Sequence, residues 1–148
     1  MAKYEMNLDL NVLNHLGINL YTKIPAVLSE AVANAYDADA ENVDVVIADD
    51  CVTITDNGSG MNTDQVNKRF LTVGYQKRTD EKETPIFHRK PMGRKGIGKL
   101  SLFSIAKNIE IHTYNGETKD AFAIDVDELK KFISDPDNSR QHKSFAPT

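Results

Sequence analysis

LSEAVANAYDADA, residues 28–40, is the most informative stretch of this 148-residue chain. It continues a helical pattern that begins at Ile24, because apolar side chains recur on one stripe at about 100° per residue. The stripe consists of Ile24, Val27, Leu28, Ala31, Ala35 and Ala38. This spacing predicts an amphipathic helix over residues 24–40 with one buried side.

Three polar residues of this helix, Glu30, Asn34 and Asp37, share a face at the border between the apolar stripe and solvent. A carboxylate beside an amide oxygen suits the activation of water near Mg²⁺, which prefers oxygen ligands and keeps several waters. The simpler interpretation is a solvated polar face. The alanines around them permit close approach of a ligand or backbone, and they also favour a helix through propensity alone. Both interpretations stay open at this point.

A second informative segment, DNGSGM at residues 56–61, follows a predicted strand. Taken alone it is typical of an Asx-type turn. In the functional interpretation, the Asp56 carboxylate accepts a hydrogen bond from the exocyclic amine of adenine, where guanine carries a carbonyl. Gly58 and Gly60 would let the backbone approach the base, and Met61 would offer its face a soft apolar surface.

The third segment, GRKGIGKLS at residues 93–101, imitates two other nucleotide motifs. It fits the P-loop spacing, but Leu100 stands where that motif needs Ser or Thr for magnesium, and no buried strand precedes it. The dinucleotide fingerprint fails at Ser101. A glycine-rich turn that enters a helix still presents backbone N–H groups to phosphate. Lys95 and Lys99 could add charge there or simply be solvated.

The remaining chain alternates short strands and helices. β-branched and alternating patterns predict strands over residues 42–48, 51–55, 109–114 and 121–126. Short helices are expected over residues 62–70, after the GRKGIG segment, and over residues 127–133. We therefore predict an α+β fold with helices on one face of a sheet.

Composition restricts the function less than the motifs do. The formal net charge of −4 gives no general attraction to nucleic acid or anionic membranes, and no apolar run is long enough to span a bilayer. We expect a cytoplasmic protein whose single cysteine, Cys51, is a small core residue. Nucleic-acid binding stays undecided, because basic residues concentrate in one stretch. They are Lys77, Arg78, Lys82, Arg89, Lys90, Arg94, Lys95 and Lys99.

Together the three segments resemble the GHKL superfamily of DNA gyrase B subunits, heat-shock-ninety chaperones, sensor histidine kinases and MutL mismatch-repair proteins. The resemblance covers roughly residues 20–115. It implies a Bergerat-type two-layer α/β sandwich, with helices on one face of a mixed, mainly antiparallel sheet. The ATP-binding domain would span residues 1–133, with a lid at about 71–96 and a tail or connector at 134–148.

The resemblance also implies roles for individual residues. Glu30 would be the general base that orients the attacking water, Asn34 would bind Mg²⁺, and Asp56 would read adenine. The residues expected around ATP or ADP are Asn34, Asp37, Asp56, Gly58, Gly60, Met61, Gly96, Ile97, Gly98 and Lys99.

The predicted function is Mg²⁺-dependent ATP binding with slow hydrolysis, lid closure and a switch in conformation or dimerisation. Two alternatives are a nucleotide-responsive module that does not hydrolyse ATP and the catalytic domain of a histidine kinase. Family members usually add a strand carrying a Thr near adenine and a domain that supplies a basic residue to the γ-phosphate. Neither is found before Thr148, so we expect a further domain or protein partner to complete the site.

Overall fold

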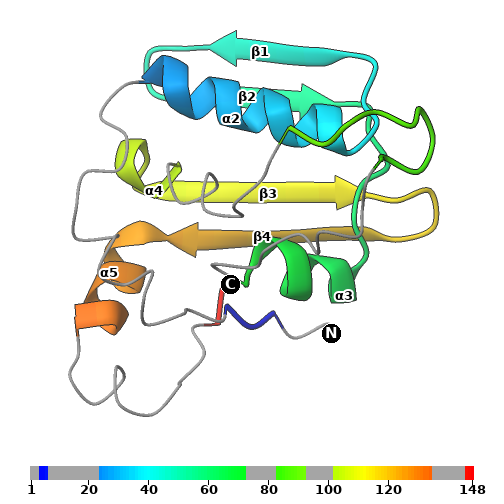
Figure 1. Cartoon of the computed structure of the whole chain (residues 1–148). Helices are drawn as coiled ribbons and strands as arrows, with labels where there is room; N and C mark the ends of the chain where they lie inside the picture. The colour runs from blue at the N-terminus through cyan, green and yellow to red at the C-terminus, as the bar shows by residue number, and fades with distance from the viewer. Residues whose placement is uncertain (1–3, 7–23, 73–82, 93–101, 135–145) are drawn as a thin grey trace.

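The structure is a computed structural model, shown in Figure 1. It describes residues 4–6, 24–72, 83–92, 102–134 and 146–148. The expected phosphate loop, which includes Gly96 and Lys99, lies outside the described residues, as does Lys77 in the expected lid.

Helix α2, Ile24–Asp37, confirms the predicted amphipathic helix and ends three residues before the predicted boundary. Its buried side chains are Val27 and Ala35, which lie two turns apart on one side of the helix. Ile24 is 51% exposed, so the apolar stripe was predicted too long at its start. The buried side of the helix therefore begins at Val27 rather than at Ile24.

Strands β1, Val43–Ile47, and β2, Val52–Asp56, form an antiparallel ladder close to the predicted positions. The Ala48 N–H closes the turn by donating to the Cys51 carbonyl over 2.9 Å. The prediction that Cys51 is a core residue was wrong: its side chain is exposed because it lies in this turn.

Strands β3, Asn108–Tyr114, and β4, Lys119–Asp125, form a second antiparallel ladder. The predicted Asn115-Gly116 turn is confirmed: the Asn115 carboxamide oxygen accepts from the N–H groups of Glu117 and Thr118 at 3.0 and 2.8 Å. Thr148 extends this ladder on the other edge of β4, because its backbone exchanges two hydrogen bonds with Ala123 at 2.7 and 3.1 Å.

The hydrophobic core lies on the β3–β4 ladder and the short helices around it. These helices are α4, Leu102–Ile105, and α5, Val126–Ser134, together with π-helix η1, Val66–Phe70. The buried cluster consists of Met6, Val66, Leu71, Phe103, Ile109, Phe122, Ile124, Val126 and Leu129. The rings of Tyr4 and Phe70 also pack against that of Phe122, tilted and edge-on respectively, with centroids 5.0 and 5.8 Å apart.

Helix α3, Thr63–Gln65, begins where the sequence predicted and runs directly into η1. Asn62 and Gln65 form a reciprocal capping box, because each side chain accepts a backbone N–H of the other residue at 2.9 and 3.0 Å. A π-helix is rare and is often found at functional sites. Its closing bond runs from the Leu71 N–H to the Val66 carbonyl at 2.8 Å.

The described elements confirm the predicted α+β class. Figure 1 shows α2 against the β1–β2 ladder, and β3 and β4 running beside it. All strand pairs among the described residues are antiparallel, so the expected mixed character is not seen in this part of the chain. In that same part, every helix is too short or too polar to cross a lipid bilayer.

Candidate functional site

The polar face of α2 carries the three predicted residues in the expected order. Glu30 and Asp37 are partly buried, whereas Asn34 is exposed. One carboxylate oxygen of Asp37 accepts the backbone N–H of Met92 at 2.6 Å. Asp37 therefore ties the end of α2 to residues 83–92, a contact that the sequence pattern did not indicate.

Asp56 is the last residue of β2 and begins the predicted glycine loop. Its Oδ1 atom accepts the Gly58 N–H at 2.9 Å, which is the Asx-type turn that the simpler interpretation predicted. The side chain is nevertheless exposed, and Oδ2 takes no part in this bond. The turn and the adenine interpretation are thus compatible, because each uses a different oxygen.

Gly60 fixes this loop against the end of β3. Its φ is +64°, and a Cβ atom there would lie 2.0 Å from the Tyr114 carbonyl oxygen. The next residue, Met61, donates its N–H to Thr113 Oγ1 at 2.8 Å. Only glycine allows this close approach of two backbones, so the loop occupies a defined place on the second ladder.

The other end of the loop is docked on the turn that follows α2. Ser59 donates its N–H to the Ala38 carbonyl at 2.8 Å, and a Cβ on Gly58 would lie 2.8 Å from that same oxygen. The Asn57 carboxamide accepts the N–H groups of Glu41 and Asn42 at 2.9 and 2.8 Å. Of the two explanations for a small residue at position 38, close backbone approach is therefore confirmed.

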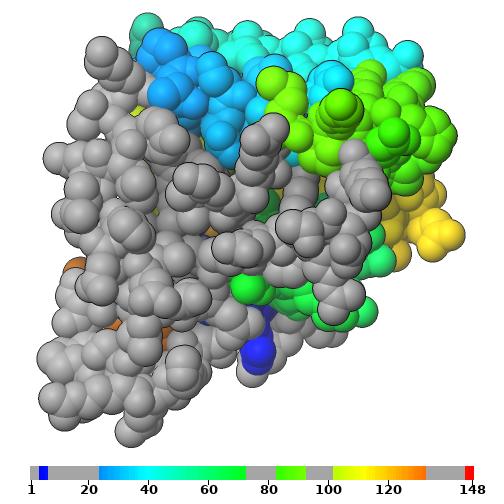
Figure 2. Space-filling model, in the orientation of Figure 1, coloured from blue at the N-terminus to red at the C-terminus, as the bar shows by residue number. Residues whose placement is uncertain are grey.

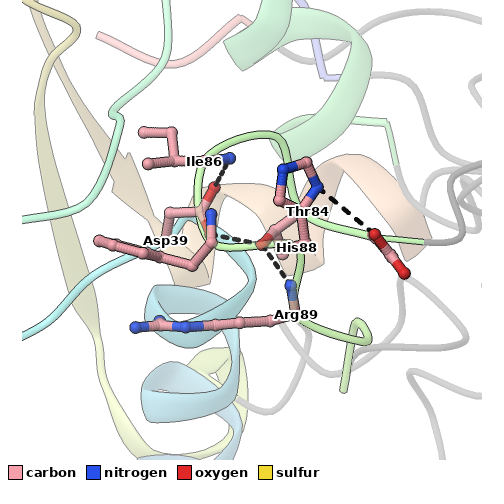
Figure 3. Close-up of polar contacts among 7 residues, drawn as sticks. Asp39, Thr84, Ile86, His88 and Arg89 are labelled. Carbon is pink, nitrogen blue, oxygen red and sulfur yellow. Dashed lines mark hydrogen bonds and ion pairs between the residues drawn. The ribbon is translucent and has the colours of Figure 1, made fainter.

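Asp39 occupies the centre of this turn and was not among the predicted site residues. It is only 4% exposed and has a φ of +60°, in the left-handed region that Asp tolerates better than most residues. Its carboxylate accepts the Thr84 hydroxyl and the N–H groups of Ile86 and Phe87, the last two at 2.9 and 3.2 Å (Figure 3). A buried aspartate thus holds residues 83–92 on α2.

Arg89 completes this arrangement. Its guanidinium donates to the Ala40 carbonyl at 2.7 Å and, more weakly, to the Tyr36 carbonyl at 3.4 Å. It also lies 4.7 and 4.6 Å from the ring centroids of Tyr36 and Phe87. A cation at a helix C-terminus interacts favourably with the helix dipole. We call Asp39, Thr84 and Arg89 the Asp39 latch.

The latch lowers the pKa of Asp39. Burial acts to raise this pKa, but the hydrogen bonds from Thr84, Ile86 and Phe87 and the charge of Arg89 outweigh it. The carboxylate is therefore charged at neutral pH, which makes it a strong acceptor. Figure 2 shows the residues of segment 83–92 beside α2 on the surface in view.

The structure thus brings two of the three predicted segments together and adds segment 83–92 to them. No pattern in the sequence indicates Thr84, and Asp39 could have been suspected only as an Asp two residues beyond the end of α2. Among the described residues no three His, Cys, Asp or Glu side chains are grouped to hold a metal ion. An open groove of about 400 Å³ lies elsewhere, along α3 and η1; it includes Thr72, at the start of the expected lid, and none of the residues predicted around the nucleotide. Its lining consists of Asn62, Asp64, Gln65, Lys68, Arg69 and Thr72.

Comparison with known proteins identifies the family of this chain. The family described as "Histidine kinase-, DNA gyrase B-, and HSP90-like ATPase" matches residues 21–145. A putative type II restriction enzyme, HgiDII, of Herpetosiphon aurantiacus is 42% identical over 131 residues, which cover 88% of this chain and 21% of that protein.

Two DNA mismatch repair proteins MutL are also similar. That of Lactobacillus delbrueckii is 32% identical over 150 residues, covering 97% of this chain and 22% of the relative. That of Listeria welshimeri is 30% identical over 123 residues, covering 80% and 20%. The chain spans about a fifth of the length of these relatives. The chain belongs to the histidine kinase-, DNA gyrase B- and HSP90-like ATPases, a family that binds adenine nucleotide.

Proposed function

We propose that this domain binds ATP with Mg²⁺ beside α2 and hydrolyses it slowly, and that the nucleotide state switches the contacts of a larger protein. The observation that best supports this is the docking of the glycine loop on the end of α2. The Ser59 N–H to Ala38 carbonyl bond of 2.8 Å joins the loop that carries Asp56 to the helix that carries Glu30 and Asn34.

Asp56 would accept the exocyclic amine of adenine through the carboxylate oxygen that its own turn does not use. Gly58 and Gly60 would act by holding the loop in place, because the side of each that lacks a side chain faces the Ala38 or Tyr114 carbonyl, and Met61 would contact the face of the base. Guanine presents an acceptor in place of that amine, so the contact would discriminate against it. The expected preference is therefore for adenine nucleotides.

Glu30 and Asn34 would act at the phosphate end. Asn34 offers one neutral oxygen, which suits an ion that takes most of its ligands from water and phosphate. When bound, Mg²⁺ would neutralise the charge of the phosphate oxygens. Glu30 would orient a water molecule and accept its proton, and the backbone N–H groups of residues 96–98, together with Lys99, would hold phosphate oxygens.

The role of this domain within a longer protein is proposed from the relatives. Both names, a putative restriction enzyme and a mismatch repair protein, belong to proteins that act on DNA. We infer that this domain, expected to span residues 1–133, serves as the nucleotide-dependent switch of such a protein, with dimerisation as its output. The lid expected at about 71–96 would close around segment 83–92, which Asp37 and Asp39 hold on the end of α2. Arg89, one of the basic residues considered for DNA, already binds the carbonyls of Tyr36 and Ala40, so direct DNA binding by that side chain is not part of the proposal.

The experiment is calorimetric titration with ADP and a non-hydrolysable ATP analogue, with and without Mg²⁺. We expect micromolar binding that Asp56→Asn weakens by about a hundredfold or more, because the amide NH₂ that replaces the free oxygen would donate where the adenine amine needs an acceptor. Asp50→Asn is the matched control, since it removes an exposed carboxylate from the β1–β2 turn. Equal binding of ADP and GDP would contradict the assigned role of Asp56.

Hydrolysis is tested separately by phosphate release. Glu30→Ala should reduce turnover by about 10²-fold or more while leaving ADP affinity nearly unchanged, since a general base acts only in the chemical step. Turnover that survives this substitution would exclude Glu30 as the base. Binding without turnover in the wild-type chain would favour the module that does not hydrolyse ATP.

A further inference from the structure

Three segments remote in sequence meet at the turn that follows α2. The Ala38 carbonyl holds the glycine loop through Ser59, as described above. The adjacent Asp39 carboxylate holds segment 83–92. The Asp37 carboxylate, one residue earlier, holds the Met92 N–H of that same segment. Consecutive residues of one turn thus fix the relative positions of the helix, the loop and the segment.

We propose that Asp39 is a positioning residue for the nucleotide site: its carboxylate clamps segment 83–92 on the end of α2 and thereby fixes Asp37 and the glycine loop that carries Asp56. This inference rests on the proposed function, because it concerns the same site. Asp39 is not expected to touch the nucleotide.

The latch has the physical properties of a rigid joint. A charged carboxylate that is 4% exposed is stable only while its hydrogen bonds are made, since an unpaired buried charge is costly. Thr84, itself 4% exposed, both donates to Asp39 and accepts the Arg89 N–H at 3.0 Å. Partial opening would therefore leave several buried polar groups unsatisfied at once, which favours one arrangement over alternatives.

The latch reaches the glycine loop through close backbone packing. The Ala38 carbonyl precedes Asp39 in the chain, and a Cβ on Gly58 would lie only 2.8 Å from its oxygen. A rotation of the turn at Asp39 moves this carbonyl into or away from the loop, because there is no free space between them. Loss of the latch should therefore displace the loop that carries Asp56 without removing any nucleotide contact directly.

The variants separate the carboxylate from the backbone conformation. Asp39→Gly removes the carboxylate at a φ of +60°, which glycine adopts without strain, and Asp39→Asn keeps the shape but removes the charge. Thr84→Val removes the hydroxyl, whereas Thr84→Ser retains it. Glu83→Gln is the matched control, because Glu83 belongs to the same segment and makes only an exposed contact with His88 at 3.4 Å.

ADP affinity is measured by calorimetry at a temperature where circular dichroism shows every variant to be folded. Asp39→Gly and Thr84→Val should each weaken ADP binding by about tenfold, and Asp39→Asn by less, since a good hydrogen bond to a charged group has about this effect. Thr84→Ser and Glu83→Gln should remain within about twofold of the wild type. Trypsin should also cleave the nucleotide-free Asp39→Gly and Thr84→Val proteins faster after Arg89, whose side chain the latch holds.

Two results would overturn the inference while leaving the proposed function standing. In the first, the wild type binds ADP and Asp39→Gly binds it equally well. In the second, Thr84→Ser loses as much affinity as Thr84→Val, which indicates a packing role rather than a hydroxyl contact. A wild-type chain that binds no adenine nucleotide would instead overturn the proposed function, and the positioning role would be rejected with it.

Discussion

The β3–β4 half of the molecule and the half made of α2 and the β1–β2 ladder are held together by different forces. Nine buried apolar residues gather on β3, β4 and the helices around them. In the described part of the other half, the buried apolar residues are Val27, Ala35 and Ala40, and a buried Asp39 and Thr84 accompany them. Val46 and Ile47 of β1 are 61% and 67% exposed.

The difference indicates which half contributes most of the folding stability and which half fixes the positions of loops. Burial of apolar area is strong but non-directional, so it stabilises the β3–β4 half without specifying a loop position. Hydrogen bonds to a buried carboxylate are directional, and they lie beside the residues proposed to bind nucleotide. The half that carries the proposed site is thus the one ordered mainly by polar contacts and close backbone packing.

The largest effect that this comparison predicts is on the core. Phe122→Ala should lower the free energy of unfolding by about 3–5 kcal/mol, because it leaves a cavity between Tyr4 and Phe70. Val46→Ala on the exposed ladder should change it by less than about 0.5 kcal/mol. Urea unfolding measures both. Equal losses would show that the β1–β2 ladder contributes a second core.

The next effect concerns the junction between the halves. Gly60→Ala should cost about 2–4 kcal/mol, because it combines a left-handed φ with a Cβ only 2.0 Å from the Tyr114 carbonyl oxygen. Gly116→Ala is the matched control, with a φ of +92° but open space around it, and should cost about 1–2 kcal/mol. Thermal unfolding compares them. Identical costs would mean that the glycine loop is not held against β3.

A smaller effect is expected when the polar half is acidified. The pKa of Asp39 is lowered in the folded chain, so its contribution to stability is complete above the ordinary pKa of about 3.9 and is lost as pH falls toward the folded value. The wild type should therefore lose more melting temperature between about pH 5 and pH 2 than Asp39→Asn does. Parallel curves for the two proteins would argue against a charged Asp39 facing Arg89.

The smallest effect concerns the exposed turn of the polar half. Cys51→Ser should change the free energy of unfolding by less than about 0.5 kcal/mol, since Cys51 is exposed. The thiol of the native protein should react with a disulfide reagent as fast as it does in the unfolded chain. Protection of the native thiol would indicate that something covers this turn.

Much of the fold was predictable because local patterns dominate it. The periods of apolar residues located the end of α2 to within about three residues and the four described strands to within about two. Asn62 indicated a helix start and Asn115 a hairpin turn. The side-chain oxygen of each accepts the backbone N–H of a residue three positions later in the chain. The errors occurred where burial depends on remote packing, as with Ile24 and Cys51.

The candidate site was predicted in part. The predicted residues were Glu30, Asn34 and Asp37 on α2 and Asp56 at the start of the glycine loop. The structure places this loop on the end of α2. The role of Asp37 as an acceptor for Met92 was not foreseen, because the two residues are 55 positions apart. The roles of these side chains toward nucleotide remain predictions that the experiments above address.

By itself the sequence determined the helix, the hairpins and the glycine loop at residues 56–61, since each depends on residues close together in the chain, and the family resemblance rests on such local motifs. Only the tertiary structure decided that Asp39 is buried and that Thr84 and Arg89 meet it. Hydrogen bonds between segments depend on how the chain folds back on itself, and no periodic pattern records that geometry. The same reason explains why Gly60 must be glycine: the atom that excludes a side chain belongs to Tyr114, on another strand.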